Sequence, residues 1–200
     1  MSISSESNVK AASYKPPVWP QIKGASVFLA GSIEMGRAVQ WQSEMTDSLS
    51  HLPVTILNPR RDNWDPSWKQ EISNREFKAQ VDWELHYLED ADVVALYLQP
   101  GTISQISLLE LGLYAKSGKL VVCCPKAFGR RGNVEIVCGR YGTTLVETWD
   151  ELKETVEQRL GKAIEQREHQ QSVFQRVLVP WKTAGFLAVL GAFMFRLVKG

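Results

Sequence analysis

Short, nearly continuous apolar runs alternate along the chain with longer segments of mixed character. Turn residues end these runs, such as Gly31 and Ser32 after the first and Asn58 and Pro59 after the second. Apolar runs of this length are typical of strands that are buried on both faces of a parallel sheet. Five strands are predicted, at residues 27–30, 54–57, 91–98, 120–124 and 144–146.

The segments between these runs have helical periodicity, most clearly at residues 41–49, 74–89 and 104–116. Alternating strands and helices predict an α/β fold: a Rossmann- or flavodoxin-like parallel sheet of about five strands, flanked by helices and followed by a C-terminal helical extension. Ligands of such sheets bind outside the carboxyl ends of the strands. The loops that follow the strands are therefore expected to converge on one cleft.

The two ends of the chain depart from this pattern. Residues 1–23 are polar and contain three prolines, which predicts a flexible arm before a domain over residues 24–150. A charged helix is predicted over 151–178, with thin apolar content. The tail, residues 179–200, has an apolar core shorter than the about 20 residues that span a membrane. Residues 180–198 are either a membrane-associated segment or a docked or partner-binding helix.

Composition narrows the function classes. The 200 residues have a formal net charge of +1, so the protein has no overall electrostatic field that would attract a nucleic acid polymer. Any substrate that resembles nucleic acid is therefore expected to be a small molecule bound in a pocket. Three cysteines without a secretory signal predict reduced thiols in an intracellular, cytoplasmic protein, with the tail as its only route to a membrane. The cysteines and histidines lack metal-ligand spacing, so no metal site is predicted and no cofactor is expected.

A single carboxylate, Glu110, interrupts the apolar run of the predicted helix at 104–116. Burying a lone carboxylate is costly unless a partner or a reaction uses it. One interpretation is a carboxylate satisfied by a backbone amide or an arginine; the other is a catalytic carboxylate beside a pocket. Helical spacing places Ser104, Ser107 and Tyr114 on the same stripe as Glu110, and a polar stripe on a buried helix needs partners or a cavity.

Other candidates follow the predicted strands. Gly31 and Ser32 can present backbone N–H groups to an anion or a sugar hydroxyl, or form an ordinary turn. The loop at residues 58–68 offers donors, carboxylates and indole rings. Trp64 in this loop can stack on a flat base, or it can pin the loop to the core. Glu84 is either a second site carboxylate or a solvated helix residue.

Three segments resemble the nucleoside 2-deoxyribosyltransferase family, with its deoxyribosyltransferase-like branch, and the related 2′-deoxynucleoside 5′-phosphate N-glycosidases. They are residues 28–33, 81–94 and 104–112. The loop from Asn58 to Asp65 is typical of the deoxyribosyltransferase-like branch. In this family the glutamate of the Glu-Leu-Gly helix is the nucleophile, which the resemblance assigns to Glu110. It would attack the anomeric carbon of a 2-deoxyribosyl group and form a glycosyl ester.

The resemblance also implies roles for other residues. Ser104 matches a phosphate-binding serine of the N-glycosidase branch, where the transferases have Asp. Glu84 matches a catalytic-site Asp of the family. Gly31 and Ser32 match the family's first turn, but Glu34 replaces a basic residue common in the phosphate-binding branch, and Arg37 is a candidate to compensate for it. The remaining candidate substrate-binding residues are Asn58, Arg60, Asn63 and Trp64.

The implied function is glycosyl transfer or hydrolysis at the N-glycosidic bond of a (deoxy)nucleoside or nucleotide. The resemblance also implies a homo-oligomer in which a neighbour completes the site, with residues 126–142 as the segment of interest. Two alternatives stay open. One is a non-catalytic nucleotide-sensing or regulatory module, and the other is an NAD-cleaving glycosidase with the same nucleophile.

Overall fold

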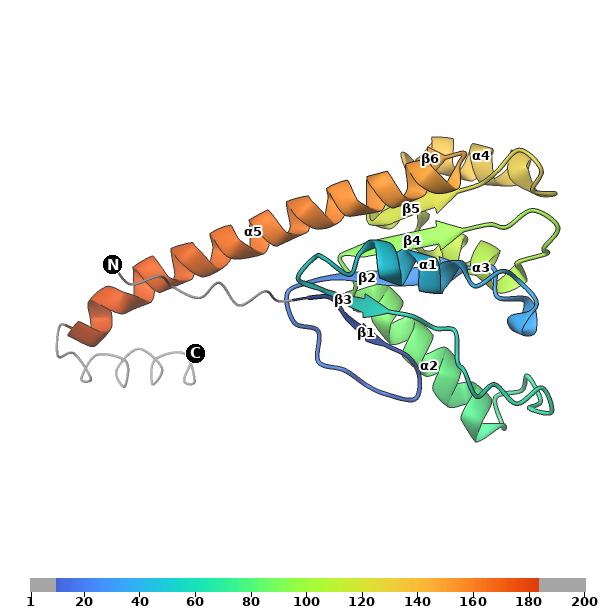
Figure 1. Ribbon diagram of the computed structural model, residues 1–200, viewed down its shortest axis with the longest axis horizontal. Helices are drawn as coiled ribbons and strands as arrows, with labels where there is room; N and C mark the ends of the chain where they lie inside the picture. Colours follow the sequence, from blue (N-terminus) through green and yellow to red (C-terminus); the bar gives the residue numbers. More distant parts are fainter. Residues whose placement is uncertain (1–9, 184–200) are drawn as a thin grey trace, which may run out of the picture. The chain divides into compact units, whose positions relative to one another are not determined.

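The computed structural model describes residues 10–183 of the chain (Figure 1). Its strands are β1 (Ala12–Tyr14), β2 (Ala25–Gly31), β3 (Val54–Leu57), β4 (Val93–Tyr97), β5 (Leu120–Cys123) and β6 (Thr144–Val146). They form one sheet in the order β1-β3-β2-β4-β5-β6, and every neighbouring pair is parallel. The predicted α/β fold is confirmed, with a sixth strand that the apolar runs did not predict.

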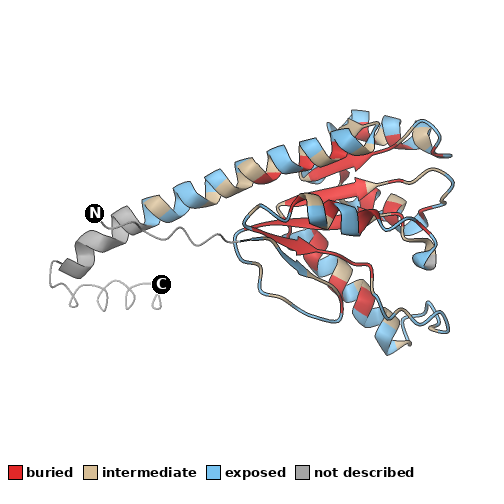
Figure 2. Cartoon of the chain, in the orientation of Figure 1, coloured by how far each residue is buried: buried red, intermediate tan, exposed pale blue. Residues whose placement is uncertain are grey.

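Helices cover both faces of this sheet (Figure 1). They are α1 (Trp41–Ser48), α2 (Arg75–Asp90), α3 (Gln105–Tyr114), α4 (Arg131–Tyr141) and α5 (Trp149–Thr183), with short 3-10 helices η1 (Glu34–Gly36) and η2 (Ala115–Ser117). Side chains alternate along β2: Phe28 packs with α2, α3 and α4, whereas Val27 and Leu29 pack with α1 and the start of α5. Both faces of the central strands are therefore buried (Figure 2).

The strand order locates the crevice of the sheet. If β1 is left out and the other strands are renumbered from β2, the strand order becomes 2-1-3-4-5, as in flavodoxin-like folds. Ligands of these folds bind where the order reverses, which in this sheet is between β2 and β4. Gly31 ends β2 at this point with φ of 136°. A Cβ atom on Gly31 would lie 2.3 Å from the carbonyl oxygen and 2.7 Å from the nitrogen of Tyr97. Only glycine allows the two strands to lie this close at the crevice.

Residues 10–23 were predicted to belong to a flexible arm, but in the structure they pack against the domain. They contribute β1, which pairs with β3, and then run along α2. The Trp83 indole donates a hydrogen bond to the Val18 carbonyl (2.7 Å), and the Tyr87 hydroxyl donates one to the Pro20 carbonyl (2.8 Å). Buried Trp and Tyr side chains need acceptors, and this segment supplies them. The sequence pattern did not reveal the pairing because both donors lie more than sixty residues away.

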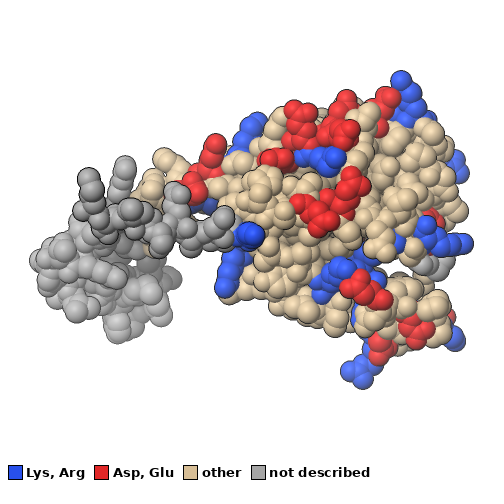
Figure 3. All heavy atoms as spheres, in the orientation of Figure 1, with Lys and Arg blue, Asp and Glu red and all other residues tan. Residues whose placement is uncertain are grey.

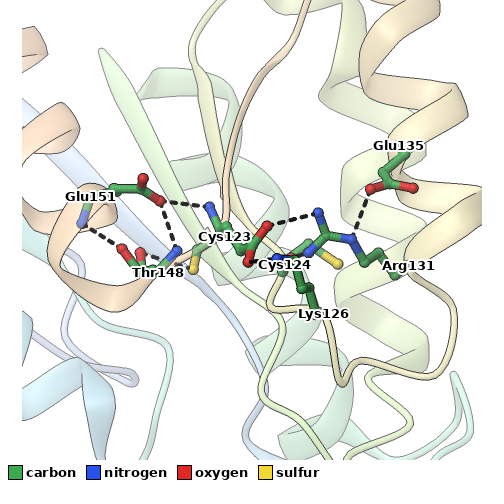
Figure 4. A network of polar contacts seen from close by, with 8 residues as sticks. Cys123, Cys124, Lys126, Arg131, Glu135, Thr148 and Glu151 are labelled. Carbon is green, nitrogen blue, oxygen red and sulfur yellow. Dashed lines mark hydrogen bonds and ion pairs between the residues drawn. The ribbon is translucent and has the colours of Figure 1, made fainter.

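Ion pairs hold the connections at the carboxyl ends of β5 and β6 (Figure 4). Arg131 donates to the Cys124 carbonyl (2.7 Å) and to Glu147 (3.2 Å). The Glu151 carboxylate accepts from the backbone N–H groups of Glu147 and Thr148, each at 2.9 Å, and so caps the start of α5. The starts of α4 and α5 are thereby fixed next to the strand ends.

The three cysteines, Cys123, Cys124 and Cys138, are buried and free. Burial raises the pKa of Cys123 to about 12 and the pKa values of Cys124 and Cys138 to about 11. These thiols are therefore protonated at neutral pH and serve as packing residues.

The chain divides into two compact units, Met1–Ile164 and Glu165–Gly200, and the sheet belongs to the first. The charged helix predicted over 151–178 lies within α5. Most of the predicted hydrophobic tail, 179–200, lies outside the described residues, and 179–183 are the end of α5. In residues 10–183 no helix is both long and apolar enough to cross a membrane.

Candidate active site

Two carboxyl groups on neighbouring helices form the centre of the candidate site. Glu110 of α3 is only 8% exposed, and its pKa is raised to about 8, first because burial disfavours the charge and second because Glu84 repels it. Glu84 of α2 is partly exposed, and burial raises its pKa to about 7. Paired acids with perturbed pKa values in a cleft are typical of catalytic sites.

Gln80 links Glu84 to the loop that follows β3. Its amide nitrogen donates to Glu84 Oε1 (2.7 Å) and to the Pro59 carbonyl (2.9 Å). The hydrogen bond from Gln80 stabilises the ionised form of Glu84 and so lowers its pKa, which opposes the larger increase caused by burial. Gln80 is 5% exposed, and within residues 10–183 its Oε1 atom has no hydrogen-bond partner. A buried acceptor without a partner is unusual in a folded protein, and here it lies next to the Glu84 carboxyl group.

A second part of the site is a cluster of three hydroxyl groups at the crevice. The Ser32 hydroxyl lies 2.5 Å from that of Ser104 and 2.9 Å from that of Thr102, and the latter two are 2.8 Å apart. The backbone N–H of Gln99 also donates to Ser32 Oγ (2.9 Å). These contacts join the carboxyl ends of β2 and β4 to the start of α3, the helix that carries Glu110.

The start of α3 is capped by a distant carboxylate. Glu34 Oε1 accepts hydrogen bonds from the backbone N–H groups of Ile103 (2.9 Å) and Ser104 (2.7 Å). Ser104 is the residue before the helix, but its own hydroxyl makes no cap. Glu34 and Ser104 both have left-handed backbones, with φ of 48° and 49°. Such conformations cost about 1–3 kcal/mol each in residues other than glycine, so the surrounding contacts hold them.

Two of the predicted substrate-binding residues, Asn58 and Arg60, are buried and make contacts within the protein. Asn58 Oδ1 accepts from the backbone N–H of Arg60 at 2.9 Å. The Arg60 guanidinium donates to three backbone carbonyls of the loop after β2, each at 2.9 Å: those of Gly36, Ala38 and Val39. The structure therefore places Arg60 as a brace for the loop that includes Glu34.

Trp64 and Asn63 lie in a separate cluster further along the same loop. The Trp64 ring meets Trp68 edge-on at 5.2 Å, and the Arg61 guanidinium lies 4.9 Å from the Trp68 ring centre. Asn63 is exposed and accepts from Arg61 Nε at 3.2 Å. The indole N–H of Trp64 is buried and has no partner among residues 10–183. Among the described residues, no hydrogen bond or ring contact joins this cluster to the two carboxyl groups, although Gln80 connects Glu84 to the start of the same loop.

Sequence reasoning missed two residues of this arrangement, Gln80 and Thr102. Gln80 precedes Glu84 by one helical turn, and that spacing is a usable signal for a side-chain contact. Thr102 lies two residues before Ser104, in the loop that was already expected at the cleft. Neither contact could be assigned without the fold, because glutamine and threonine are common on helices and in turns.

A groove of about 320 Å³ lies between α3 and α4, and neither Glu84 nor Glu110 lines it. It is lined by Leu108, Leu111, Gly112, Arg130, Asn133, Val134 and Val137. Large apolar side chains are also exposed on these two helices, among them Ile106, Leu109, Leu113 and Ile136. Charges of both signs occur on the face seen in Figure 3, in keeping with the small net charge.

The chain matches the model of one known family. The family described as nucleoside 2-deoxyribosyltransferase like matches residues 24–128, more than half of the chain. The chain belongs to this family, whose description indicates glycosyl transfer at nucleosides. Among solved structures, it is similar to a conserved protein from Enterococcus faecalis V583, with 14% identity and a TM-score of 0.49 over 68% of this chain and 99% of that one. No curated protein matches the chain.

Proposed function

We propose that the protein cleaves the N-glycosidic bond of a small (deoxy)nucleoside by nucleophilic attack of Glu110 on the anomeric carbon. The observation that carries this proposal is a carboxyl group, Glu110, that is only 8% exposed and lies close enough to a second carboxyl group, Glu84, for the two charges to interact. Membership of the nucleoside 2-deoxyribosyltransferase-like family supports glycosyl transfer as the reaction class. The burial of Glu110 beside Glu84 supports the assignment of these two residues to the reaction.

The chemistry proceeds in two displacements. A Glu110 oxygen forms a bond to the anomeric carbon while the bond to the base nitrogen breaks, through an oxocarbenium-like transition state. The base leaves with the bonding electron pair and takes up a proton. A second base, or water, then attacks the same carbon and displaces the Glu110 carboxylate, so the configuration is retained. Transfer and hydrolysis differ only in this acceptor.

Glu84 is suited to carry the proton. Its pKa of about 7 leaves it partly protonated at neutral pH, where a carboxyl group both donates and accepts readily. The Gln80 amide holds one Glu84 oxygen and so orients the group. We assign Glu84 to proton transfer with the leaving base or to holding a sugar hydroxyl.

The spacing along α3 orients the sugar. Ser104 precedes Glu110 by six residues, a rise of about 9 Å in an α-helix. With the anomeric carbon at Glu110, the 5′ end of the pentose points toward Ser104 and Ser32. Gly31 allows β2 to approach closely enough for this. The base then lies toward the loop after β3, which carries Asn63 and the Trp64 ring.

We also propose that the protein is a homo-oligomer that associates through α3 and α4. Leu109, Leu113 and Ile136 are each at least 58% exposed, and clustered exposed apolar side chains mark interaction surfaces. Arg130 and Asn133 line the groove beside them and are placed to contact a neighbouring copy. Leu109→Arg is expected to yield smaller particles in sedimentation velocity, whereas the exposed control Val173→Arg in α5 leaves the size unchanged.

The test of the function uses purified full-length chain and separation of bases by chromatography. Wild type is incubated with 2′-deoxynucleosides, 2′-deoxynucleotides and NAD, each with and without a second free base, and binding of the same compounds is measured by calorimetry. Base release or exchange is expected, and Glu110→Gln should reduce it by at least about a thousandfold. Glu154→Gln, an exposed acid of α5, is the control and should keep full activity.

Other outcomes point to other functions. Cleavage of NAD in place of deoxynucleosides identifies a ribosyl glycosidase with the same nucleophile. Binding of nucleotides by folded protein without turnover of any substrate overturns the catalytic proposal and leaves a nucleotide-sensing module.

A further inference from the structure

A carboxylate, Glu34, lies beside the cluster of hydroxyl groups formed by Ser32, Thr102 and Ser104. Helix N-termini such as that of α3 are places where anions bind, because backbone N–H groups point outward there. In this protein the N–H groups of Ile103 and Ser104 are both taken by Glu34 Oε1, at 2.9 and 2.7 Å. A carboxylate of the protein itself therefore lies next to Ser104, just before the first turn of α3.

Glu34 is held firmly in this position. It is partly buried, it begins η1, and its backbone has φ of 48°. The segment that follows it is braced by the Arg60 guanidinium, which donates to the carbonyls of Gly36 and Ala38. A carboxylate whose backbone is fixed in this way does not leave the helix start freely when a ligand arrives.

No cation neutralises this carboxylate in the described part of the chain. Arg37 is the nearest basic residue in sequence, but its Nε donates to the Glu34 backbone carbonyl at 3.4 Å. The Arg60 guanidinium donates to backbone carbonyls and to Gln42. A phosphate at Ser104 would therefore meet a like charge, and like charges at contact distance repel strongly in a partly buried site.

We propose that Glu34 restricts the substrate to nucleosides with an uncharged 5′-hydroxyl and excludes the corresponding 5′-phosphates. This inference rests on the proposed function, because the position of Glu110 determines which end of the sugar reaches Glu34. A 5′-hydroxyl donates a hydrogen bond to Glu34 Oε2 or to the hydroxyl cluster, whereas a phosphate offers no donor and adds negative charge. Glu34 is thus a specificity-determining residue, and Ser104 alone would wrongly suggest a nucleotide.

The test compares ligands that differ only in the phosphate. Wild type, Glu34→Gln and the control Glu154→Gln are titrated calorimetrically with a 2′-deoxynucleoside, with its 5′-monophosphate and with inorganic phosphate, and kcat/KM is measured for the first two. Glutamine keeps the length and one acceptor oxygen while it removes the charge. We expect wild type and the control to prefer the deoxynucleoside by at least about tenfold. In Glu34→Gln the monophosphate gains roughly tenfold to a hundredfold, and inorganic phosphate binds.

Tighter binding of the monophosphate by wild type overturns the inference, and this comparison needs no variant. An unchanged ligand preference in a folded Glu34→Gln protein also overturns it. Failure of the proposed function gives a different result from failure of the role of Glu34. In that case the deoxynucleoside is bound in preference to the monophosphate, but neither compound is cleaved or exchanged. Turnover with a preference for the monophosphate leaves the function standing and removes the role of Glu34. Binding of neither ligand contradicts both.

Discussion

Glu84 raises the pKa of Glu110, although the two carboxyl groups belong to different helices, α2 and α3. Burial is the larger cause of the raised pKa, which reaches about 8, and the repulsion from Glu84 adds to it. The pair therefore retains a proton near neutral pH, and both groups are ionised only above about pH 8. Ionisation of the proposed nucleophile is thus coupled to the charge of its neighbour.

This coupling predicts the pH dependence of activity. Attack requires ionised Glu110, and proton donation to the leaving base requires protonated Glu84. We therefore expect kcat/KM to rise as Glu110 ionises and to fall as Glu84 loses its proton, with a maximum between about pH 7 and pH 8. Glu84→Gln removes the neighbouring negative charge, lowers the pKa of Glu110, and should move the midpoint of the rising limb to lower pH. Profiles of kcat/KM against pH for both proteins measure this. An identical midpoint in the two profiles would show that the carboxyl groups are not coupled.

The raised pKa of Glu110 also predicts an effect on stability. The folded protein binds this proton more tightly than the unfolded chain, whose pKa is the ordinary 4.5, so Glu110 costs stability progressively as pH rises from about 4.5 to about 8. Glu110→Gln should leave Tm nearly unchanged at pH 4.5. At pH 8.5 it should raise Tm by roughly 4–8 °C, if about 2 kcal/mol of burial cost is relieved. Calorimetry at the two pH values tests this, with Glu154→Gln as the control.

Arg60 is predicted to act through the loop that it braces. Arg60→Ala leaves the carbonyls of Gly36, Ala38 and Val39 without their donor, and should lower the free energy of unfolding by about 2–3 kcal/mol. The neighbouring variant Arg61→Ala loses only the contacts with Trp68 and Asn63, and should cost less than about 1 kcal/mol. Urea unfolding measures the free energy of unfolding of both variants. An equal decrease in the two variants would show that Arg60 does not brace the loop.

Gly31 is predicted to be irreplaceable at the crevice. In Gly31→Ala the new methyl group would overlap the Tyr97 backbone at 2.3 and 2.7 Å and also require an unfavourable φ, so stability should fall by about 3 kcal/mol or more. Gly161→Ala in α5 is the matched control, since its methyl group meets nothing within 4 Å. Alanine favours helices, so that variant should gain up to about 1 kcal/mol. Thermal unfolding that ranks the two variants in the opposite order would be incompatible with the close approach.

The sheet and the crevice were predictable because their signals are local. The runs that end at Gly31 and Leu57 can be recognised as buried strands from the few apolar residues that each run contains. β1 was not predictable, because Ala12–Tyr14 carries no apolar run and is held by pairing with β3. Its segment continues to Val18 and Pro20, whose acceptor roles depend on aromatic donors far away in the sequence.

The candidate site shows the same division between local and distant information. The polar stripe of α3 is local, and it identified Glu110 and Ser104. The partners of these residues are distant: Glu34 caps the helix from seventy residues away, in place of the Ser104 hydroxyl. Arg60 looked like a ligand-binding cation in sequence, but its donors are taken by a loop about twenty residues earlier. Side-chain type indicates what a residue can bind, and only the fold shows what it does bind.

The central claim is tested most directly by the mass of the peptide that contains Glu110. Wild type is incubated without an acceptor base with a 2-fluoro-substituted nucleoside, because fluorine destabilises the oxocarbenium-like transition state and slows loss of the sugar from the enzyme. After acid quenching and digestion, we expect this peptide to be heavier by one fluorinated pentosyl group, and the corresponding peptide of Glu110→Gln to carry no such group. Base release by wild type without an adduct, together with full activity of Glu110→Gln on the natural substrate, would show that Glu110 is not the nucleophile.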